Sequence, residues 1–384
     1  MITNGINFKN FQINKKFKQI TIILNRILKK KNQVIQSLSN NYKDSFNFKA
    51  IKKYKKFKNF RLIGIGGSSL GAEAIYDFLR KKTKKNFSFV NDLDVNTENK
   101  KDKNCLNLII SKSGETLETI VNSNIIINKK DKSLIITEKK DNYLYRLAQK
   151  LKTEVIHHNN FIGGRYSVLS ETGMLPAQLM GLDCKKFRQL NNLVKNKKYL
   201  NALISNVSSI IFFIKKKKYN SVIINYDKNS ENLFFWYQQL VAESLGKKKG
   251  GLLPIISSMP KDNHSVMQLY LDGFKNNFFT FFYVYDDKSE KINKFPLLKS
   301  HNYLKKRKIN DIIYSQKKAS EIVFTKKNIP FRSFEIKYRN EKTLGELFCF
   351  FILETILLGR LLNLNPYDQP AVELIKKETK KLLI

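Results

Sequence analysis

The spacing of apolar residues is most regular between residues 230 and 246, where it predicts a helix that begins near Ser230 and ends at Gly246. Gln239 and Glu243 lie four residues apart and therefore share one face of this helix. Glu243 falls in the last turn, where the helix dipole is unfavourable for a carboxylate. It is either a solvated glutamate near a helix end or a general base held in position. The apolar face consists of Leu233, Trp236, Tyr237, Leu240 and Val241.

Two apolar runs, each followed by a polar turn and a helical pattern, predict two strand–turn–helix units. The first strand, at 61–65, leads into the turn Gly-Gly-Ser-Ser at 66–69, and the second, at 106–110, leads into a polar turn at 111–116. Free backbone N–H groups, hydroxyls and a lysine suit a phosphate group. If the two strands are parallel neighbours, both turns border one crevice for a phosphorylated small molecule. The alternative is that the turns only cap their helices.

The rest of the pattern predicts an α/β protein with two halves. Residues 1–55 have a lysine-rich helical pattern, residues 185–220 are helical and basic, and short strands are expected at 221–226 and 250–257. We therefore divide the chain into an N-terminal helical segment (1–55), a first α/β half with the phosphate loops (56–200), a second α/β half (201–365) and a C-terminal helix (366–384).

The composition is strongly basic, since 71 Lys and Arg against 32 Asp and Glu give a net charge of +39. Lysine, asparagine, isoleucine, phenylalanine and tyrosine are all abundant, which is typical of an AT-rich genome. The alternative is a nucleic-acid-binding protein, which would gather its basic residues on one face or tail. The basic runs are instead scattered, for example at 29–31, 215–218 and 247–249. A positive field would still attract small anionic substrates.

The cysteine and apolar content favour a cytoplasmic protein. Three cysteines lie far apart in the sequence, at positions 105, 184 and 349, so free thiols are expected. Residues 1–19 contain no apolar signal segment. The apolar run at 347–358 contains Glu354 and is shorter than the ~20 residues of a membrane span, so it predicts a buried helix and no membrane partner.

Two residues in the middle of the chain are candidates for chemistry. Arg165 follows two glycines, and its permanent charge at the end of a loop could stabilise a developing oxyanion. His264 lies between polar residues and could shuttle protons with a pKa of ~6.5, although such a histidine is more often structural. His157 and His158 are interpreted as solvated, and no further metal ligands are spaced with them, so no metal site is expected.

The C-terminal segment predicts a last helix with Pro370 in its first turn. Asp368 or Gln369 would cap this helix. Gln369 and Lys376 would then lie on one side, two turns apart.

Taken together, five motifs in the same order resemble the glucose-6-phosphate isomerase family. They are the turns that begin at 64 and 111, Gly-Gly-Arg-Tyr-Ser at 163–167, Gln-x-x-x-Glu-Ser-x-Gly-Lys at 239–247 and Tyr-Asp-Gln-x-Ala-Val-Glu-x-x-Lys at 367–376. The resemblance extends from about residue 60 to the C-terminus. It implies two three-layer αβα sandwiches of the sugar-isomerase fold, each around a mainly parallel sheet, in a homodimer.

The resemblance also implies a reaction and a set of site residues. The reaction is the interconversion of glucose 6-phosphate and fructose 6-phosphate through a cis-enediol, in glycolysis and gluconeogenesis, without a cofactor. Glu243 would carry the proton between C2 and C1, Arg165 would steady the enediolate, and His264, from the partner subunit, and Lys376 would open the sugar ring. The residues implied in substrate binding are Gly67, Ser68, Ser111, Lys112, Ser113, Thr116, Gln239 and Gln369.

The chain departs from the family at three points. Glu115 stands in the second phosphate loop, and because its carboxylate would repel a phosphate, we predict that it turns away. Ala242 replaces a frequent glycine, and the N-terminal region is short. Three alternatives remain: a related isomerase that also accepts mannose 6-phosphate, a non-catalytic sugar-phosphate sensor, and a nucleic-acid-binding protein.

Overall fold

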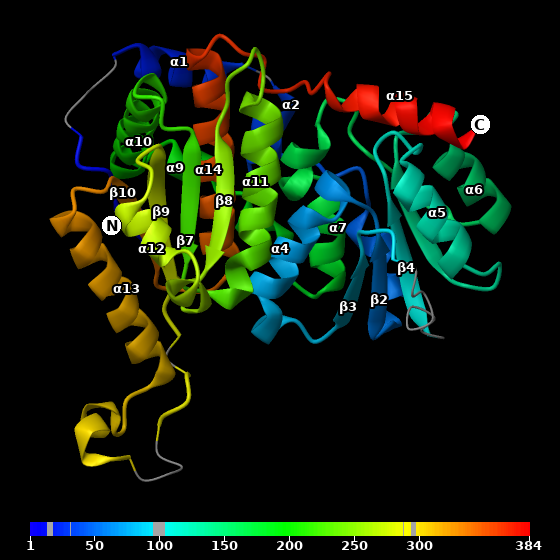
Figure 1. Cartoon of the computed structure of the whole chain (residues 1–384). Coiled ribbons are helices and arrows are strands. Elements are labelled where there is room, and N and C mark those ends of the chain that lie inside the picture. Colours follow the sequence, from blue (N-terminus) through cyan, green and yellow to red (C-terminus); the bar gives the residue numbers. More distant parts are fainter. Residues whose placement is uncertain (14–17, 31, 95–103, 287, 293–296) are drawn as a thin grey trace.

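The computed structural model describes residues 1–13, 18–30, 32–94, 104–286, 288–292 and 297–384. Two five-stranded sheets lie side by side, and each carries helices on both of its faces (Figure 1). This arrangement confirms the predicted pair of αβα sandwiches with mainly parallel sheets. The strands are β1 (Ile6–Lys9), β2 (Asn59–Ile63), β3 (Asn86–Val90), β4 (Cys105–Ile110), β5 (Ser133–Thr137), β6 (Glu154–His157), β7 (Asn220–Asn225), β8 (Leu253–Ser258), β9 (Asn277–Val284) and β10 (Phe331–Ile336).

Helices of very different length surround the sheets. The α-helices are α1 (Lys18–Lys29), α2 (Gln33–Ser37), α3 (Phe48–Ile51), α4 (Leu70–Phe78), α5 (Leu117–Ile126), α6 (Tyr143–Leu151), α7 (Glu171–Leu179), α8 (Cys184–Phe187), α9 (Leu190–Leu193), α10 (Lys197–Lys215), α11 (Glu231–Leu245), α12 (Met267–Asp272), α13 (Ile309–Lys326), α14 (Glu341–Leu361) and α15 (Val372–Leu383). The 3₁₀ turns include η1 (Lys52–Lys56), η2 (Gly66–Ser68), η5 (Gly164–Leu169), η7 (Lys261–His264) and η8 (Lys299–Leu304).

The first sheet has the order β3-β2-β4-β5-β6, with every described pair parallel. Because side chains alternate between the faces of a strand, Leu108 and Ile110 of β4 enter the main core, whereas Ile109 packs with Leu144 and Ala148 of α6. β2 and β4 are direct neighbours, which confirms the predicted pairing of the two strands that lead into the polar turns.

The second sheet has the order β1-β10-β9-β7-β8. Of the strand pairs that the structure describes in this sheet, only β1 with β10 is antiparallel, with Ile6 opposite Ile336. The pattern of residues 1–55 predicts helix throughout, and this is wrong for β1, because a four-residue strand is too short to be recognised by its periodicity. Ile20, Leu24 and Ile27 of α1 are buried, and α1 packs against α10 and α14, on the second half of the molecule.

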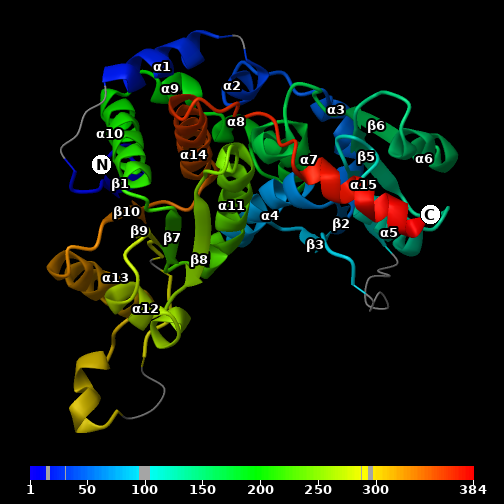
Figure 2. The ribbon, with the colours of Figure 1, turned by 45° about the horizontal axis from the view of Figure 1, so that its top comes forward.

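One hydrophobic core connects the two halves. It includes Leu108 of the first sheet, Leu240 of α11 and Phe351 of α14. α14 is buried along nearly its whole length, as predicted for residues 347–358. α11 contacts α4, α14 and β8, so it lies at the boundary between the two halves (Figures 1 and 2). α11 itself spans almost the predicted residues.

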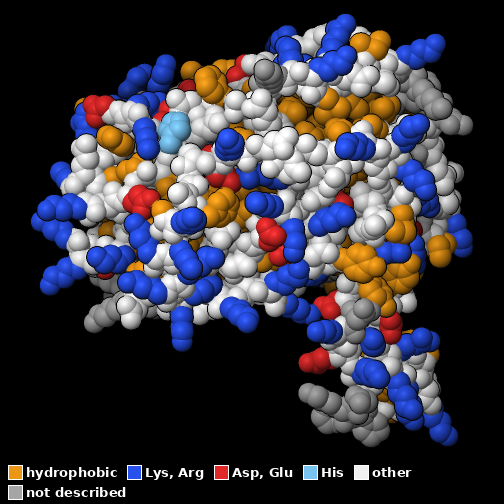
Figure 3. Space-filling model, turned by 180° about the vertical axis from the view of Figure 1, so that it is seen from behind, with side chains coloured by type: hydrophobic (Ala, Val, Ile, Leu, Met, Phe, Trp, Pro, Cys, Tyr) orange, Lys and Arg blue, Asp and Glu red, His pale blue; other side chains and the backbone are white. Residues whose placement is uncertain are grey.

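Two segments extend from this body. The segment around η8, before α13, projects away from the second sheet, and α15 extends across the first half near α5 and α6 (Figures 1 and 2). α15 has no buried residue. Lys and Arg side chains are spread over the face seen in Figure 3 without gathering in one patch. Among the described residues, no helix is long and apolar enough to cross a membrane.

Candidate active site

Arg165 is the centre of the side-chain cluster that joins the two halves. Its side chain is fully buried, and all five of its N–H donors have an acceptor. Nε donates to Ser244 Oγ at 2.8 Å, and Nη1 donates to Glu243 Oε2 at 3.2 Å and to Gln369 Oε1 at 2.5 Å. Nη2 donates to the backbone carbonyl groups of Pro366 at 2.7 Å and Asp368 at 3.0 Å. The guanidinium is therefore fixed in one orientation.

Glu243 is held from two sides and is still open to solvent. Its Oε1 accepts a hydrogen bond from Gln239 Nε2 at 2.9 Å, one helical turn earlier on α11. Its Oε2 faces Arg165, and the side chain is 28% exposed. A solvated glutamate at a helix end would have no such partners, so the geometry favours a positioned carboxylate.

The first glycine turn packs directly against the loop that carries Arg165. A Cβ atom on Gly67 would lie 2.2 Å from the carbonyl carbon of Gly164, so only glycine allows this approach. Gly66 has a φ of +58°, and Gln239 Nε2 lies close to it. The turn after β2 and Gln239 on α11 are thus brought to the same place.

The second polar turn is organised by its own hydroxyl groups. Ser111 Oγ lies 2.8 Å from Thr116 Oγ1 and accepts from the Gly114 N–H at 3.2 Å. Ser111 is buried, whereas Ser113 is exposed. Glu115 Oε1 accepts a hydrogen bond from the N–H of Tyr143 at 2.7 Å, which confirms that this carboxylate turns away to the start of α6.

Lys112 reaches across to the loop before Arg165. Its Nζ donates to the carbonyl oxygen of Asn160 at 2.7 Å and lies 3.8 Å from Glu138 Oε1. Burial lowers the pKa of this ammonium, although Glu138 acts in the opposite direction. His158 lies buried nearby, so its interpretation as a solvated residue is wrong, and burial lowers its pKa to about 4.

The structure does not bring His264 or Lys376 into this cluster. His264 is exposed at the end of η7, after β8. Lys376 lies on α15, where its Nζ pairs with Glu373 at 2.7 Å and its side chain is 67% exposed. The last helix begins at Val372 instead of near Pro370, so Gln369 precedes it and does not share a helix side with Lys376.

Several residues that support Arg165 lie in or beside the quoted motifs but had no predicted role at the site. Tyr166 Oη lies 2.9 Å from Ser244 Oγ and donates to the carbonyl oxygen of Pro366 at 2.9 Å. Trp236 Nε1 donates to the carbonyl oxygen of Arg165 at 3.2 Å. Ser244 directly follows Glu243 in the motif at 239–247, and this position could have indicated that its hydroxyl group belongs to the site.

A salt bridge anchors the loop that supplies Gln369. Lys247 Nζ lies 2.7 Å from Asp368 Oδ1 and also donates to the carbonyl oxygen of Asn365. The hydrogen bond from Lys247 lowers the pKa of Asp368 below its usual range. Lys247 is the last residue of the motif that begins at Gln239, so its place in the motif could have indicated that it belongs to the site.

The cluster has the parts that a proton-transfer reaction on a phosphorylated sugar requires. It combines a partly exposed carboxylate, a fixed positive charge and two polar turns at the carboxyl ends of neighbouring strands. Within the described part of the chain, no group of three or more His, Cys, Asp or Glu side chains could hold a metal ion.

Comparison with known proteins relates this geometry to a family. The sequence profile described as phosphoglucose isomerase matches residues 13–252. Glucose-6-phosphate isomerase from Methanocaldococcus jannaschii is 32% identical over 357 residues, which cover 88% of each chain. The enzyme of the same name from Mycoplasmopsis pulmonis is also 32% identical, over 84% of this chain and 82% of its own.

Solved structures support the same fold. A hypothetical protein from Thermus thermophilus superposes with a TM-score of 0.82 at 21% identity, over 95% of this chain and 94% of its own. A glucose-6-phosphate isomerase from Chlamydia trachomatis gives a TM-score of 0.70 at 17% identity, over 88% of this chain and 72% of its own.

Proposed function

Because the chain belongs to the phosphoglucose isomerase family and interconverts glucose 6-phosphate and fructose 6-phosphate, we propose that Glu243 is the base that moves the proton between C2 and C1. The observation that carries this proposal is that Gln239 and Arg165 both donate hydrogen bonds to the carboxylate, while the Glu243 side chain remains partly exposed. Proton transfer is faster when the base is already held close to the C–H group and in the correct orientation.

The proposed reaction has two proton transfers at carbon, one from C2 to Glu243 and one from Glu243 to C1. Glu243 takes the proton from C2 of the open-chain aldose, the C–H electrons form the C1–C2 double bond, and the C1 carbonyl becomes an enediolate oxygen. The same carboxyl group then returns the proton to C1 as the C2 carbonyl forms, while a hydroxyl proton passes from O2 to O1. The reaction is a step of glycolysis.

Arg165 and Gln369 would stabilise the enediolate in this proposal. The fixed guanidinium places positive charge beside Glu243, and Gln369 lies within 2.5 Å of the same nitrogen, Nη1. Charge that is organised in advance stabilises a developing oxyanion without reorganisation during the reaction. Gln239 would position the substrate on the other side of Glu243.

The phosphate group of the substrate would bind at the two polar turns. The support is their location at the carboxyl ends of β2 and β4, where backbone N–H groups and hydroxyls are available. Lys112 would contribute positive charge more than a direct contact, because its Nζ is already bonded to Asn160. The proposed phosphate ligands are Gly67, Ser68, Ser111, Ser113 and Thr116, and Lys112 would add positive charge beside them.

Ring opening would fall to Lys376 and to His264 of the partner subunit, in a cytoplasmic homodimer. These assignments come from the family resemblance, since neither side chain contacts the Arg165 cluster in the single described chain. Exposed apolar side chains on the two projecting segments, such as Leu298 at 77% and Ile375 at 71%, support a surface that is covered in an assembly.

The function is tested by coupled assay of fructose 6-phosphate conversion by the purified chain and by Glu243→Gln. The substitution keeps the shape of the side chain but removes the base, so kcat should fall by about 10²–10⁴-fold. Glu231→Gln, at the start of the same helix, is the matched control and should retain activity. Full activity in Glu243→Gln would reject Glu243 as the base.

A further inference from the structure

A cavity of about 870 Å³ lies at the edge of the first sheet that is opposite the active site. Its lining includes Ser133 and Glu154, the first residues of β5 and β6, so it lies at the amino ends of these strands. The polar turns of the active site instead follow the carboxyl ends of β2 and β4. We call it the amino-edge cavity. The size is in the range of pockets that hold cofactor-sized ligands. Its lining residues come from three segments, 53–57, 129–133 and 151–154.

The amino-edge cavity is much more basic than the chain as a whole. Lysine supplies 61 of the 384 residues, or about one in six, but six of the 13 residues that line the cavity. Such a concave concentration of one charge focuses the electrostatic potential on a small anion. The six are Lys53, Lys56, Lys129, Lys130, Lys132 and Lys152.

The two carboxylates in the lining do not neutralise these lysines. Glu154 Oε2 accepts from Tyr54 Oη at 3.2 Å and pairs with Lys53 at 3.0 Å, so these two opposite charges cancel. Asp131 Oδ2 accepts instead from the backbone N–H of Asn128 at 2.9 Å. Within the described residues, the other five lysines make no ion pair, so protein carboxylates do not neutralise their charges.

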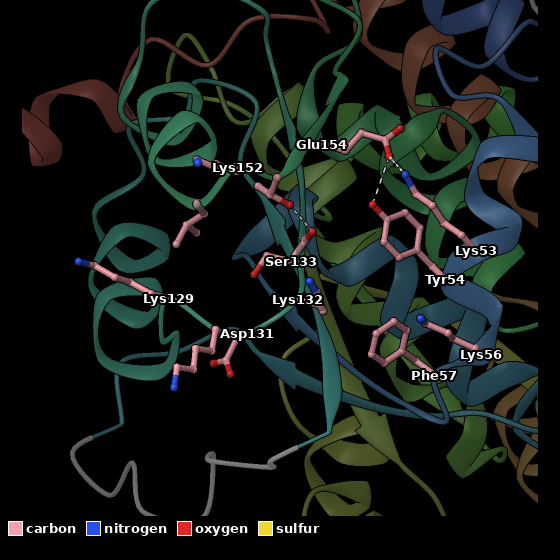
Figure 4. Close-up of a pocket in the computed structure, with 13 residues that line it drawn as sticks. Lys53, Tyr54, Lys56, Phe57, Lys129, Asp131, Lys132, Ser133, Lys152 and Glu154 are labelled. Atoms are coloured by element: carbon pink, nitrogen blue, oxygen red, sulfur yellow. Dashed lines mark hydrogen bonds and ion pairs between the residues drawn. The ribbon is translucent and has the colours of Figure 1, made fainter.

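The two sides of the cavity differ in chemistry. Figure 4 shows Tyr54 and Phe57 on one side and Lys129 and Lys152 on the other, with Ser133 between them. The two aromatic side chains are only partly buried, so their rings can contact a ligand. Ser133 Oγ is buried beneath the cavity and has no hydrogen-bond partner among the described atoms. A buried hydroxyl without a partner is costly, and a ligand oxygen would provide an acceptor.

We propose that the amino-edge cavity binds a nucleoside polyphosphate, with its phosphates among the lysines of 129–132 and Lys152 and its base against Tyr54 and Phe57. A single phosphate would leave most of these positive charges unmatched, whereas a triphosphate matches several of them through charge-assisted hydrogen bonds. Aromatic rings provide stacking contacts for a base. The cavity, at about 870 Å³, has room for one such ligand but not for a nucleic-acid duplex.

The test is isothermal titration calorimetry of the 384-residue protein with ATP at 150 mM salt, with saturating fructose 6-phosphate to occupy the active site. Lys129→Glu/Lys132→Glu should weaken ATP binding by about tenfold or more, because it removes charge-assisted contacts. Lys216→Glu/Lys217→Glu, at exposed positions outside the cavity, changes the net charge equally and is the matched control. Isomerase activity should be unchanged in both double variants.

The same titration distinguishes the possible ligands. Phe57→Leu should weaken ATP but not inorganic tripolyphosphate, and the wild-type protein should bind ATP more tightly than tripolyphosphate. Equal losses in the two lysine variants would overturn the proposal in favour of nonspecific attraction by the net charge. Absence of ATP binding, or tighter binding of single-stranded RNA with the same dependence on Lys129 and Lys132, would also overturn it.

Discussion

Nη1 of Arg165 lies 3.2 Å from Oε2 of Glu243, across the boundary between the two halves of the molecule. Arg165 comes from η5, after the first sheet, and Glu243 comes from α11, after β7 of the second sheet. The pair therefore exists only when the two halves pack together. Arg165 is fully buried and the Glu243 side chain is 28% exposed, so the carboxylate of Glu243 is the group of this pair that a substrate can reach.

Arg165→Lys keeps the positive charge but loses the fixed orientation of the guanidinium. It should lower kcat by about 10²–10³-fold, which is the usual effect of removing one preorganised hydrogen-bond donor from an oxyanion site. Lysine offers three donors where the guanidinium uses five, so acceptors such as the Asp368 carbonyl lose the hydrogen bond that Arg165 donates. Steady-state kinetics measure the effect. Ser244→Ala removes the acceptor for Nε and the partner of Tyr166 Oη but leaves the guanidinium in place, and it should cost less. An Arg165→Lys enzyme with the kcat of the wild type would be incompatible with a role for the guanidinium.

Gly67→Ala should destabilise the protein by about 1–3 kcal/mol, the usual cost of overpacking. The new Cβ would lie 2.2 Å from backbone atoms of Gly164, which cannot rotate away. Urea unfolding measures the change. Gly163→Ala is the matched control, because its Cβ would meet nothing closer than 3.9 Å. Equal stability of the two variants would show that the two loops do not pack as described.

The local parts of this site could be predicted from the sequence, because strand, turn and helix follow one another within a few residues. The turn after β2 and the helix that carries Glu243 are examples. The partners of Arg165 could not be derived from spacing, since Glu243 is 78 residues away and Pro366 is 201 residues away. Only the family resemblance indicated that these segments belong to one site.

Two other features were missed because they depend on tertiary contacts. β1 is four residues long and is stabilised by pairing with β10, more than 300 residues later. His158 has no apolar pattern around it, and its burial results from the packing of the loop after β6. Sequence periodicity carries no information about such distant neighbours.

Stability should decrease in acid partly through Glu335. Burial alone would raise the pKa of this carboxyl group, but Lys317 and Lys318, at 2.6 Å and 2.7 Å, outweigh it and lower the pKa to about 2. Because the folded pKa lies below the unfolded value of 4.5, this stabilisation is complete above pH 4.5 and is lost as the pH falls towards 2.

Glu335→Gln should therefore flatten the pH dependence of the unfolding free energy between about pH 5 and pH 2. Urea unfolding at a series of pH values measures it. Glu378→Gln on the exposed α15 is the control and should leave the curve as in the wild type. An unchanged slope in Glu335→Gln would mean that Lys317 and Lys318 do not stabilise its ionised form.

Mixing two inactive variants tests whether the partner supplies His264. Glu243→Gln and His264→Ala should each be inactive alone. If the site combines Glu243 of one chain with His264 of the other, half of the randomly reassembled dimers contain one intact site, so activity should recover to about a quarter of the wild type. Coupled assay after refolding of the mixture measures the recovery. A mixture that stays inactive would place both residues of a site on the same chain.

Incorporation of deuterium into substrate in D₂O, followed by proton NMR, tests the role of Glu243 most directly. The wild-type protein should exchange the transferred hydrogen at C1 and C2 with solvent during isomerisation, because a carboxyl group that holds the proton can lose it to water. Glu243→Gln should bind fructose 6-phosphate and exchange none. Exchange at the wild-type rate in Glu243→Gln would contradict the account, since another group would then carry the proton.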